Sequence, residues 1–459
     1  MIPLVRAPAL FLLLLTSCGG KSTSVPDGGD ADSDSDADSD ADTDTGDVVH
    51  PDDEIFDPDV IHTYELEIAP EDWEWLNDNA TLEQYVQGAL LYDGEGGRER
   101  YENIGVRYKG GFGALQSCFD WLGRRTCAKL SIKVSFNEYD SAGRFHDLRK
   151  LQFHSMNKDP SQMRERIAYD LFRESGVRTA RTAYARLFVN GEDLGLFVLV
   201  EQFDGSFTDR HFDPEGGDGN LYKEVWPMHG AEQPYVDALQ TNEEVADVSG
   251  MTSFAAALAA AGDETFLDVL GEWTDLESMW NYVAVDRGLS HWDGITAWYC
   301  VGAGGAECFN HNFYWYEQES QDRMWLVPWD MDHSLTPSPW ETYYDVPAWL
   351  EQVDDCSPTE IWPGVGVRAP SCDPLIDRIG RMGGGSGKGG WAEAGGRFLD
   401  GPFAEAKVLG TIDALEAQIS DIVADDANGP GLTDFGAAVD ELRALVPQLR
   451  ARFETEIGR

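Results

Sequence analysis

The sequence is poor in basic residues. Its 459 residues include 34 Lys and Arg against 83 Asp and Glu, which gives a formal net charge of −49 at pH 7. Nucleic acids and anionic membrane faces would repel a chain of this charge, so neither is an expected partner. A cation or a basic protein segment would be attracted instead.

Long apolar runs are also scarce. The run at 10–15 follows one basic residue, Arg6, and is too short to cross a bilayer, so it is typical of a secretion signal. The sequence LTSC, which ends at Cys18, matches the bacterial lipobox. We therefore expect residues 1–18 to be a lipoprotein signal and Cys18 to carry a lipid in the bacterial envelope, at the outer membrane or cell surface. An ordinary signal peptide with a chance cysteine is the alternative.

The chain lacks a C-x-x-C pair and any Cys/His cluster at zinc spacing, which disfavours a zinc site. Without Cys18, six of the seven cysteines remain, an even number that suits an oxidising compartment. Three local disulfides are the preferred pairing, although other connectivities are open. The pairs would be Cys118–Cys127, Cys300–Cys308 and Cys356–Cys372.

Residues 19–59 are expected to form a disordered tether. They include PDGGDADSDSDADSDADTDTGD, which has no aromatic and no basic residue. Such a segment cannot bury enough apolar area to offset the entropy of ordering, and its like charges keep it extended. The pattern lacks the Gly and the terminal Glu of an EF-hand loop, so a calcium loop is not expected.

From residue 60 the patterns predict an α+β domain. Alternating strand signals start at Ile61, and further strands are predicted, one of them with a hairpin turn at NGEDLG. One strong helix, PSQMRERIAYDLFRESG, begins at Pro160 and ends before Gly176. The further predicted strands are 104–110, 129–136, 150–156 and those within 183–203.

Residues 219–459 are mainly helical in pattern, apart from a buried strand pair at HNFYWYE and MWLVPWD. The stretch 356–402 is rich in Gly, Pro and Cys and is predicted to be an irregular loop region. It contains GGGSGKGG, which lacks the leading Gly and the Ser or Thr of a phosphate-binding loop. Two helices, at 403–424 and 434–457, close the chain.

Several polar residues stand where apolar segments end. In LVPWDMDHSL, Asp330 and Asp332 would face the same way on an extended backbone, so both could bind one cation that prefers oxygen ligands. Asp293 follows a helix and Asn312 heads a strand. An Asp, an Asn and an Asp are what metal-assisted phosphoryl transfer requires. Capping roles are the alternative.

Candidate phosphate-binding residues lie nearer the N-terminus. Lys109 precedes glycines in VRYKGGFGA, and Lys129 begins KLSIKVSF. Glu165 starts the strong helix and could pair with a strand lysine, as in kinases. Glu201 and Lys223 are a further candidate pair. Solvated lysines on half-exposed strands are the alternative.

These motifs, in this order, resemble the spore coat protein H (CotH) kinase family from about residue 105 to 335. The matching segments include VRYKGG, KLSIKVSF, GNLYK, HWDG, HNFYWYE and PWDMDHS. The resemblance implies an atypical protein-kinase-like fold, with a strand-rich N-lobe (60–218) and a mainly helical C-lobe (219–459). It also implies ATP bound between the lobes with Mg²⁺, or Mn²⁺ as an alternative.

The resemblance implies roles for single residues. Asp293 resembles the catalytic aspartate, and Asn312 and Asp330 resemble the metal ligands, with Asp332 as a second candidate. Lys129 resembles the phosphate-contacting lysine, with Glu165 as its ion-pair partner. Lys109 stands where the family has a Lys or Arg followed by Gly-Asn-Ser, whereas this chain has Gly-Gly-Phe.

Together with the lipobox, the resemblance implies an exported, lipid-anchored kinase, and we expect the protein to be a monomer. Its acceptor would be Ser or Thr of a basic extracytoplasmic protein. A non-catalytic surface protein that uses the same fold for binding or adhesion is the alternative. A metal-dependent glycosyltransferase is a third possibility and depends on the D-x-D motif alone.

Overall fold

The computed structural model describes residues 50–94, 96–111, 114–212, 219–228, 230–302, 307–336, 350–384 and 390–459. Within them, Pro51–Arg459 forms one compact unit. The unit contains both helices and strands, so the prediction of a mixed α+β protein is confirmed.

The folded unit begins before the residue at which the expected tether ends. Ile55 and Phe56 are 0% and 6% exposed and pack into the apolar core of an N-terminal barrel. The prediction of a tether is therefore wrong for residues 51–59. Burial of these two large apolar side chains helps to anchor the acidic stretch.

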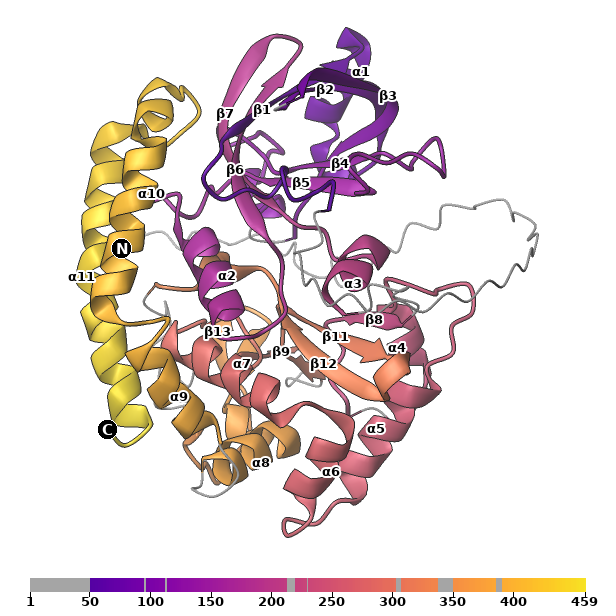
Figure 1. The fold of residues 1–459 in the computed structure, drawn as a ribbon. Coiled ribbons are helices and arrows are strands. Elements are labelled where there is room, and N and C mark those ends of the chain that lie inside the picture. Colours follow the sequence, from indigo (N-terminus) through magenta and orange to yellow (C-terminus); the bar gives the residue numbers. More distant parts are fainter. Residues whose placement is uncertain are drawn as a thin grey trace, which may run out of the picture. The chain divides into compact units, whose positions relative to one another are not determined.

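Seven strands close into a barrel in the order β1-β2-β3-β4-β5-β7-β6 (Figure 1). β1 and β6 pair in parallel, and the other neighbours pair antiparallel. Successive residues of a strand point to opposite sides, so apolar side chains from one face fill the barrel. The outer face of β6 and β7 is also apolar and packs into a second apolar core, through Tyr184, Leu196, Val198 and Val200. The strands are β1 (His62–Ile68), β2 (Val86–Gly94), β3 (Gly97–Tyr108), β4 (Ile132–Ser135), β5 (Lys150–His154), β6 (Thr182–Val189) and β7 (Glu192–Val200).

Two local signals of the barrel region are confirmed. The NGEDLG segment joins β6 to β7, and Asn190 and Gly191 both have the positive φ, 51° and 80°, that a two-residue hairpin turn requires. The strong helix is α2 (Arg164–Glu174), and Gly176 follows its end at φ 79°. The helix starts later than predicted because the Asp159 carboxylate accepts the backbone N–H groups at its start.

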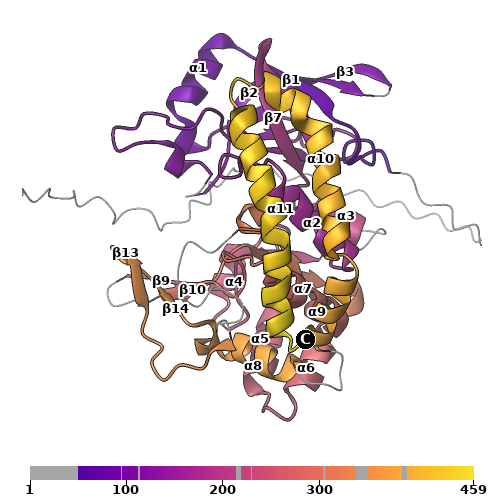
Figure 2. The same cartoon turned by 90° about the vertical axis from the view of Figure 1, so that its left-hand side faces the viewer.

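Beyond the barrel, most helices lie around one small sheet (Figure 1), and a second small sheet lies to one side of them (Figure 2). One sheet has the order β12-β11-β8 and contains the predicted buried strand pair, and the other has the order β10-β9-β14-β13. The strands are β8 (Asn220–Lys223), β9 (Trp298–Val301), β10 (Glu307–Phe309), β11 (Phe313–Gln318), β12 (Arg323–Pro328), β13 (Thr359–Trp362) and β14 (Val365–Arg368). The helices, with α1 beside the barrel, are α1 (Pro70–Asp78), α3 (Gly205–His211), α4 (Gln233–Ala238), α5 (Ser249–Ala260), α6 (Phe266–Trp273), α7 (Leu276–Gly288), α8 (Pro374–Gly383) and α9 (Trp391–Asp400).

The two predicted C-terminal helices are confirmed as α10 (Glu405–Asp425) and α11 (Gly431–Glu456), which lie side by side (Figures 1 and 2). Asp426, at the end of α10, accepts hydrogen bonds from the buried Lys129 ammonium and from the Leu196 N–H, each at 3.1 Å. α11 also contacts α7 and α9. The helix pair therefore ties the barrel to the helical part of the unit.

The prediction of an irregular loop over 356–402 is wrong. This stretch contains β13, β14, α8 and α9. Asp373 starts α8 by accepting two backbone N–H groups, at 3.0 and 2.8 Å, and an apolar helix face follows it. Because this stretch is rich in glycine, its composition alone does not indicate these helices. Residues 385–389 of the GGGSGKGG segment lie outside the described residues.

All three predicted disulfides are confirmed, and each closes a short loop. Such bonds indicate an oxidising compartment. No helix in the part of the chain that the structure describes is long and apolar enough to cross a membrane. The pairs are Cys118–Cys127, Cys300–Cys308 and Cys356–Cys372.

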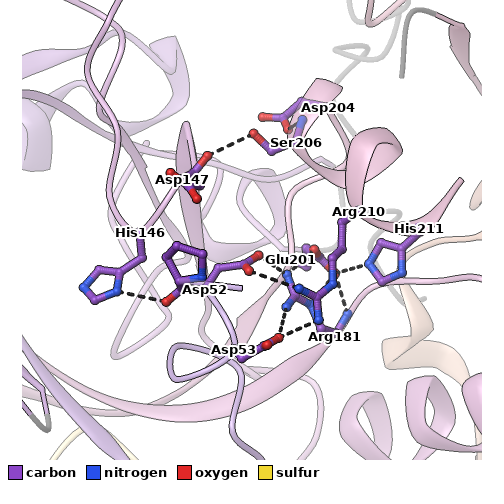
Figure 3. Close-up of polar contacts among 11 residues, drawn as sticks. Asp52, Asp53, His146, Asp147, Arg181, Glu201, Asp204, Ser206, Arg210 and His211 are labelled. Carbon is purple, nitrogen blue, oxygen red and sulfur yellow. Dashed lines mark hydrogen bonds and ion pairs between the residues drawn. The ribbon is translucent and has the colours of Figure 1, made fainter. Parts of the chain in front are cut away.

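A buried cluster of charges holds residues 51–53 against the barrel (Figure 3). Arg181 pairs with Glu201 at 2.6 Å and with Asp52. The His211 ring hydrogen-bonds to Glu201 at 2.9 Å. Burial alone would raise the pKa of Glu201, but His211 and Arg181 outweigh it and hold that pKa well below its usual range.

Replacement of Glu201 by Gln is expected to lower the free energy of unfolding by about 3 kcal/mol, because it leaves a buried cation short of a partner. Urea unfolding at pH 7 measures this. The loss should shrink in acid, since a carboxyl group with a lowered pKa stabilises the fold only while it is ionised. The control Arg98→Gln breaks an exposed pair with Glu65, and we expect it to cost less than about 1 kcal/mol. Equal losses for the two variants would contradict the prediction.

Candidate active site

Two residues with a left-handed backbone flank the β11–β12 pair at one end. Asn312 precedes β11 and Asp330 follows β12, with φ of 61° and 55°. Non-glycine residues rarely adopt this conformation, and those that do are concentrated at functional sites. The Asn312 carbonyl accepts the N–H of Trp329 at 3.1 Å, and the Asp330 N–H donates to the hydroxyl of Tyr169 on α2 at 3.1 Å. Backbone contacts thus hold both residues at the same end of the strand pair.

Asp293 lies in the turn after α7, and two side chains hold its carboxylate. The Asn312 amide donates to Asp293 Oδ2 at 3.0 Å and to its backbone carbonyl at 2.9 Å, and the Tyr299 hydroxyl donates to Oδ1 at 2.6 Å. The turn depends on Gly294, because a Cβ there would lie 2.5 Å from the buried Asp286 carboxylate. Since Asn312 uses its amide N–H groups on Asp293, its amide oxygen is the atom that it can present to a cation.

Asp332 lies in the short 3₁₀ helix η4 (Met331–His333), two residues after Asp330. Burial and the Asp330 carboxylate raise the pKa of Asp332 well above its usual range, and Glu165 and Asp293 act in the same direction. Carboxylates from three separate segments therefore lie close enough to repel one another. A divalent cation among them would relieve this repulsion.

The donor set fits a cation that prefers oxygen, such as Mg²⁺ or Mn²⁺. Among the described residues, no group of three His, Cys, Asp or Glu side chains is arranged to hold a metal ion. A cation would therefore also require the Asn312 amide oxygen, together with water or substrate oxygens. Magnesium sites of this kind commonly keep several water ligands.

Lys109 projects from the outer face of the barrel into the same site. Its ammonium donates to Gln152 Oε1 at 2.5 Å and to His154 Nε2 at 2.7 Å, and it lies 5.2 Å from the ring centroid of Trp329. Burial lowers the pKa of Lys109 to about 8, although the carboxylates of Asp330 and Glu165 act in the opposite direction. The lysine and the strand-end aspartates thus share one electrostatic environment.

Glu165, in the first turn of α2, faces the barrel. Its carboxylate lies 2.8 Å from His154 Nδ1. The imidazole therefore stands between Glu165 and Lys109. Lys133 lies on the same outer face of the barrel, and burial and the nearby Lys150 and Lys109 lower its pKa well below the usual range.

The family model of the CotH kinase protein matches residues 106–378, which is more than half of the chain. The chain belongs to the CotH kinase family. Invasin CotH2 of Rhizopus delemar is 23% identical over 180 residues, which are 36% of this chain and 30% of that protein. The chain thus covers less than a third of this relative. The crystal structure of the Helicobacter pylori proinflammatory kinase CtkA is 9% identical, with a TM-score of 0.31, and the match covers 71% of this chain and 92% of that chain.

Of the residues that the CotH resemblance singles out, all but one lie in this site. Asp293 and Asn312 are in direct contact. Lys109, Glu165, Asp330 and Asp332 act on one another electrostatically. No sequence pattern singles out His154, Gln152 or Tyr169, because each is an ordinary strand or helix residue that only the fold brings here.

Lys129 is the exception, and its expected pairing with Glu165 is wrong. Its side chain is 3% exposed, and its ammonium lies 3.1 Å from Asp426 and also donates to the Leu196 carbonyl. Lys129 lies before β4, which begins at Ile132, so strand alternation does not fix its direction, and its side chain points to Asp426 at the end of α10. The expected pair of Glu201 with Lys223 is also not formed, because Glu201 pairs with Arg181 and His211.

We expect Lys129→Met to lower the free energy of unfolding by about 3–5 kcal/mol, because Asp426 would become a buried charge without a cation. Lys109→Met should cost no more than about 1 kcal/mol, since it removes a desolvated ammonium from a polar site. Urea denaturation of both variants checks this. If Lys109→Met lowers the free energy of unfolding more than Lys129→Met does, the structural role of Lys129 and the placement of Lys109 in the site are contradicted.

Proposed function

We propose that this protein is an exported kinase that transfers the γ-phosphate of ATP to Ser or Thr of another protein. One observation carries the proposal. The Lys109 ammonium lies 5.2 Å from the ring centroid of Trp329, the residue directly before Asp330, so the cationic barrel face and the strand-end carboxylates belong to one site. Phosphoryl transfer needs both kinds of group, because the phosphates must be neutralised while the attacking hydroxyl must be oriented by a carboxylate.

In this proposal the barrel is the N-lobe and the remaining part of the unit is the C-lobe, with their boundary near residue 218. ATP binds between them. The proposal is supported by the origin of the site residues, since Lys109 comes from the barrel and Asn312 and Asp330 come from the β11–β12 pair.

Asp293 has the role of orienting the acceptor hydroxyl and accepting its proton. The two hydrogen bonds from Tyr299 and Asn312 fix its carboxylate for this task. Such proton transfer contributes about 10²–10⁴-fold to a rate. The half-buried setting of Asp293 leaves room for a hydroxyl to reach it.

Phosphate binding is assigned to Lys109, in place of Lys129, whose ammonium is bonded elsewhere. Asn312, Asp330 and Asp332 are the residues that would hold Mg²⁺ or Mn²⁺. The metal ion, when bound, supplies positive charge between the phosphate oxygens. Glu165 acts on Lys109 from α2.

The setting of the protein is part of the proposal. Three disulfides support a place outside the cytoplasm. We further propose that a lipid on Cys18 anchors the protein in the bacterial envelope, at the outer membrane or cell surface, and that it acts as a monomer. The net charge of −49 favours a basic Ser-containing exported acceptor and disfavours nucleic acid.

A non-catalytic binding role on the same fold is the second candidate. It is favoured by the name of the curated relative, an invasin. ATP is scarce outside the cytoplasm, which also favours this alternative. The two functions differ in one measurable respect, the transfer of phosphate.

The purified full-length protein should bind ATP in the presence of Mg²⁺ and incorporate ³²P into a basic Ser-containing protein. We expect Asp293→Asn to lower the rate by about 10²–10⁴-fold while ATP binding is retained. Asp330→Asn should weaken the Mg²⁺ dependence of ATP binding. Asp434→Asn, at an exposed position on α11, is the matched control and should retain full activity. Full incorporation in both site variants would reject the assigned roles, and no nucleotide binding by the wild type would favour the binding protein.

Nucleotide affinity should depend on pH through Lys109. Its pKa of about 8 means that the ammonium is charged below pH 8 and loses its charge above it. We therefore expect the affinity for an ATP analogue to fall as pH rises from 8 to 9.5. Calorimetric titration at several pH values measures this. Lys109→Arg keeps its charge over this range and should lose the dependence. The same decline in the arginine variant would assign it to another group.

A further inference from the structure

The His154 imidazole stands between Lys109 and Glu165, and both of its ring nitrogens are engaged. Nε2 lies 2.7 Å from the Lys109 ammonium, and Nδ1 lies 2.8 Å from the Glu165 carboxylate. An ammonium can only donate hydrogen bonds, so Nε2 must be an acceptor. Nδ1 must then carry the proton and donate it to Glu165. These contacts fix the neutral form of the ring and one tautomer.

Lys109 therefore has two neutral acceptors, His154 and Gln152, at hydrogen-bond distance. Among the described residues, its ammonium forms no ion pair with a carboxylate. A lysine bonded directly to a carboxylate has most of its charge compensated, whereas neutral acceptors orient the ammonium and leave its charge available. An anionic ligand can then pair with it.

The imidazole is itself held in place. His154 is 8% exposed at the end of β5, and its ring centroid lies 5.9 Å from that of Trp329, directly before Asp330. The Lys109 ammonium lies over the same indole ring. Lysine, imidazole and indole thus pack as a unit beside the strand-end aspartate.

We propose that His154 is the positioning residue for Lys109: its neutral ring links the lysine to Glu165 on α2, points the ammonium at a triphosphate and keeps the Glu165 carboxylate from replacing that anion. This inference rests on the proposed function, since the triphosphate is its ligand. It also assigns Glu165 an indirect contact with Lys109, because hydrogen bonds connect the two residues through the imidazole.

The rival explanation is that His154 only fills space. Its replacement by Leu removes both hydrogen bonds and keeps an apolar side chain against Trp329. Replacement by Gln restores an acceptor for Lys109 and a donor for Glu165 on one side chain. The matched control is His211→Leu. It removes an imidazole that also contacts a glutamate, Glu201 at 2.9 Å, in the cluster that holds residues 51–53.

Two readouts are needed, and one of them does not depend on activity. The first is the change in KM for ATP compared with the change in kcat. The second is the pH dependence of Lys109 acylation by an amine-reactive reagent, followed by peptide mass spectrometry, because only the neutral amine reacts. We expect His154→Leu to raise KM for ATP about 10- to 100-fold, as loss of a hydrogen bond to a charged group predicts, with a smaller effect on kcat. It should also shift the acylation midpoint of Lys109 to lower pH, because the charged form loses an acceptor.

His154→Gln should return KM for ATP to within about threefold of the wild type and restore the acylation midpoint of Lys109. His211→Leu should change neither KM nor the midpoint. An unchanged acylation midpoint in His154→Leu, or equal defects in the Leu and Gln variants, would overturn the inference. If the wild type binds no nucleotide while the midpoint still shifts, the link from His154 to Lys109 stands and its use for a triphosphate is overturned. These outcomes separate a failure of this inference from a failure of the proposed kinase activity.

Discussion

Strand alternation in β3, β4 and β5 is the constraint on which the site depends. The strands that fill the barrel with Val106 and Phe153 present Lys133 and Gln152 on their other face, and Lys109 follows directly after β3. A shift of one residue in register would exchange the two faces and bury the lysines in the apolar core. The packing of the barrel interior therefore fixes where the positive charges lie.

The second determinant is α2, which serves both halves of the site. It carries Tyr169, whose hydroxyl accepts the Asp330 N–H, and Glu165, whose carboxylate accepts from the His154 ring. A rotation of this one helix would move Asp330 and, through His154, Lys109 together. The helix is well suited to such a role, because Asp159 caps its start and both of these residues are buried.

Local patterns predicted much of the fold and part of the site. The NGEDLG turn and the long C-terminal helices follow from signals within a few residues, and the structure has them. The site aspartates could be found because each ends an apolar segment. The partner of Lys129 could not, since Asp426 lies 297 residues further along the chain. The His154 bridge was missed for the same reason, because no local pattern shows which lysine and glutamate will meet around a strand histidine. The helices in 356–402 were missed because abundant glycine outweighs a short apolar periodicity in a reading of composition.

The charge cluster around Arg181 also determines how a pulling force on the chain before Pro51 would be transmitted to the folded unit. A pull on the chain before Pro51 would first reach the Asp52–Arg181–Glu201 contacts, and Glu201 directly follows β7. β7 includes Leu196, whose N–H is bonded to Asp426 at the end of α10. Val200, directly before Glu201, is paired with Gln152 of β5, and the Gln152 side chain accepts a hydrogen bond from the Lys109 ammonium. A load on the chain before Pro51 would therefore be passed to a strand that positions Lys109.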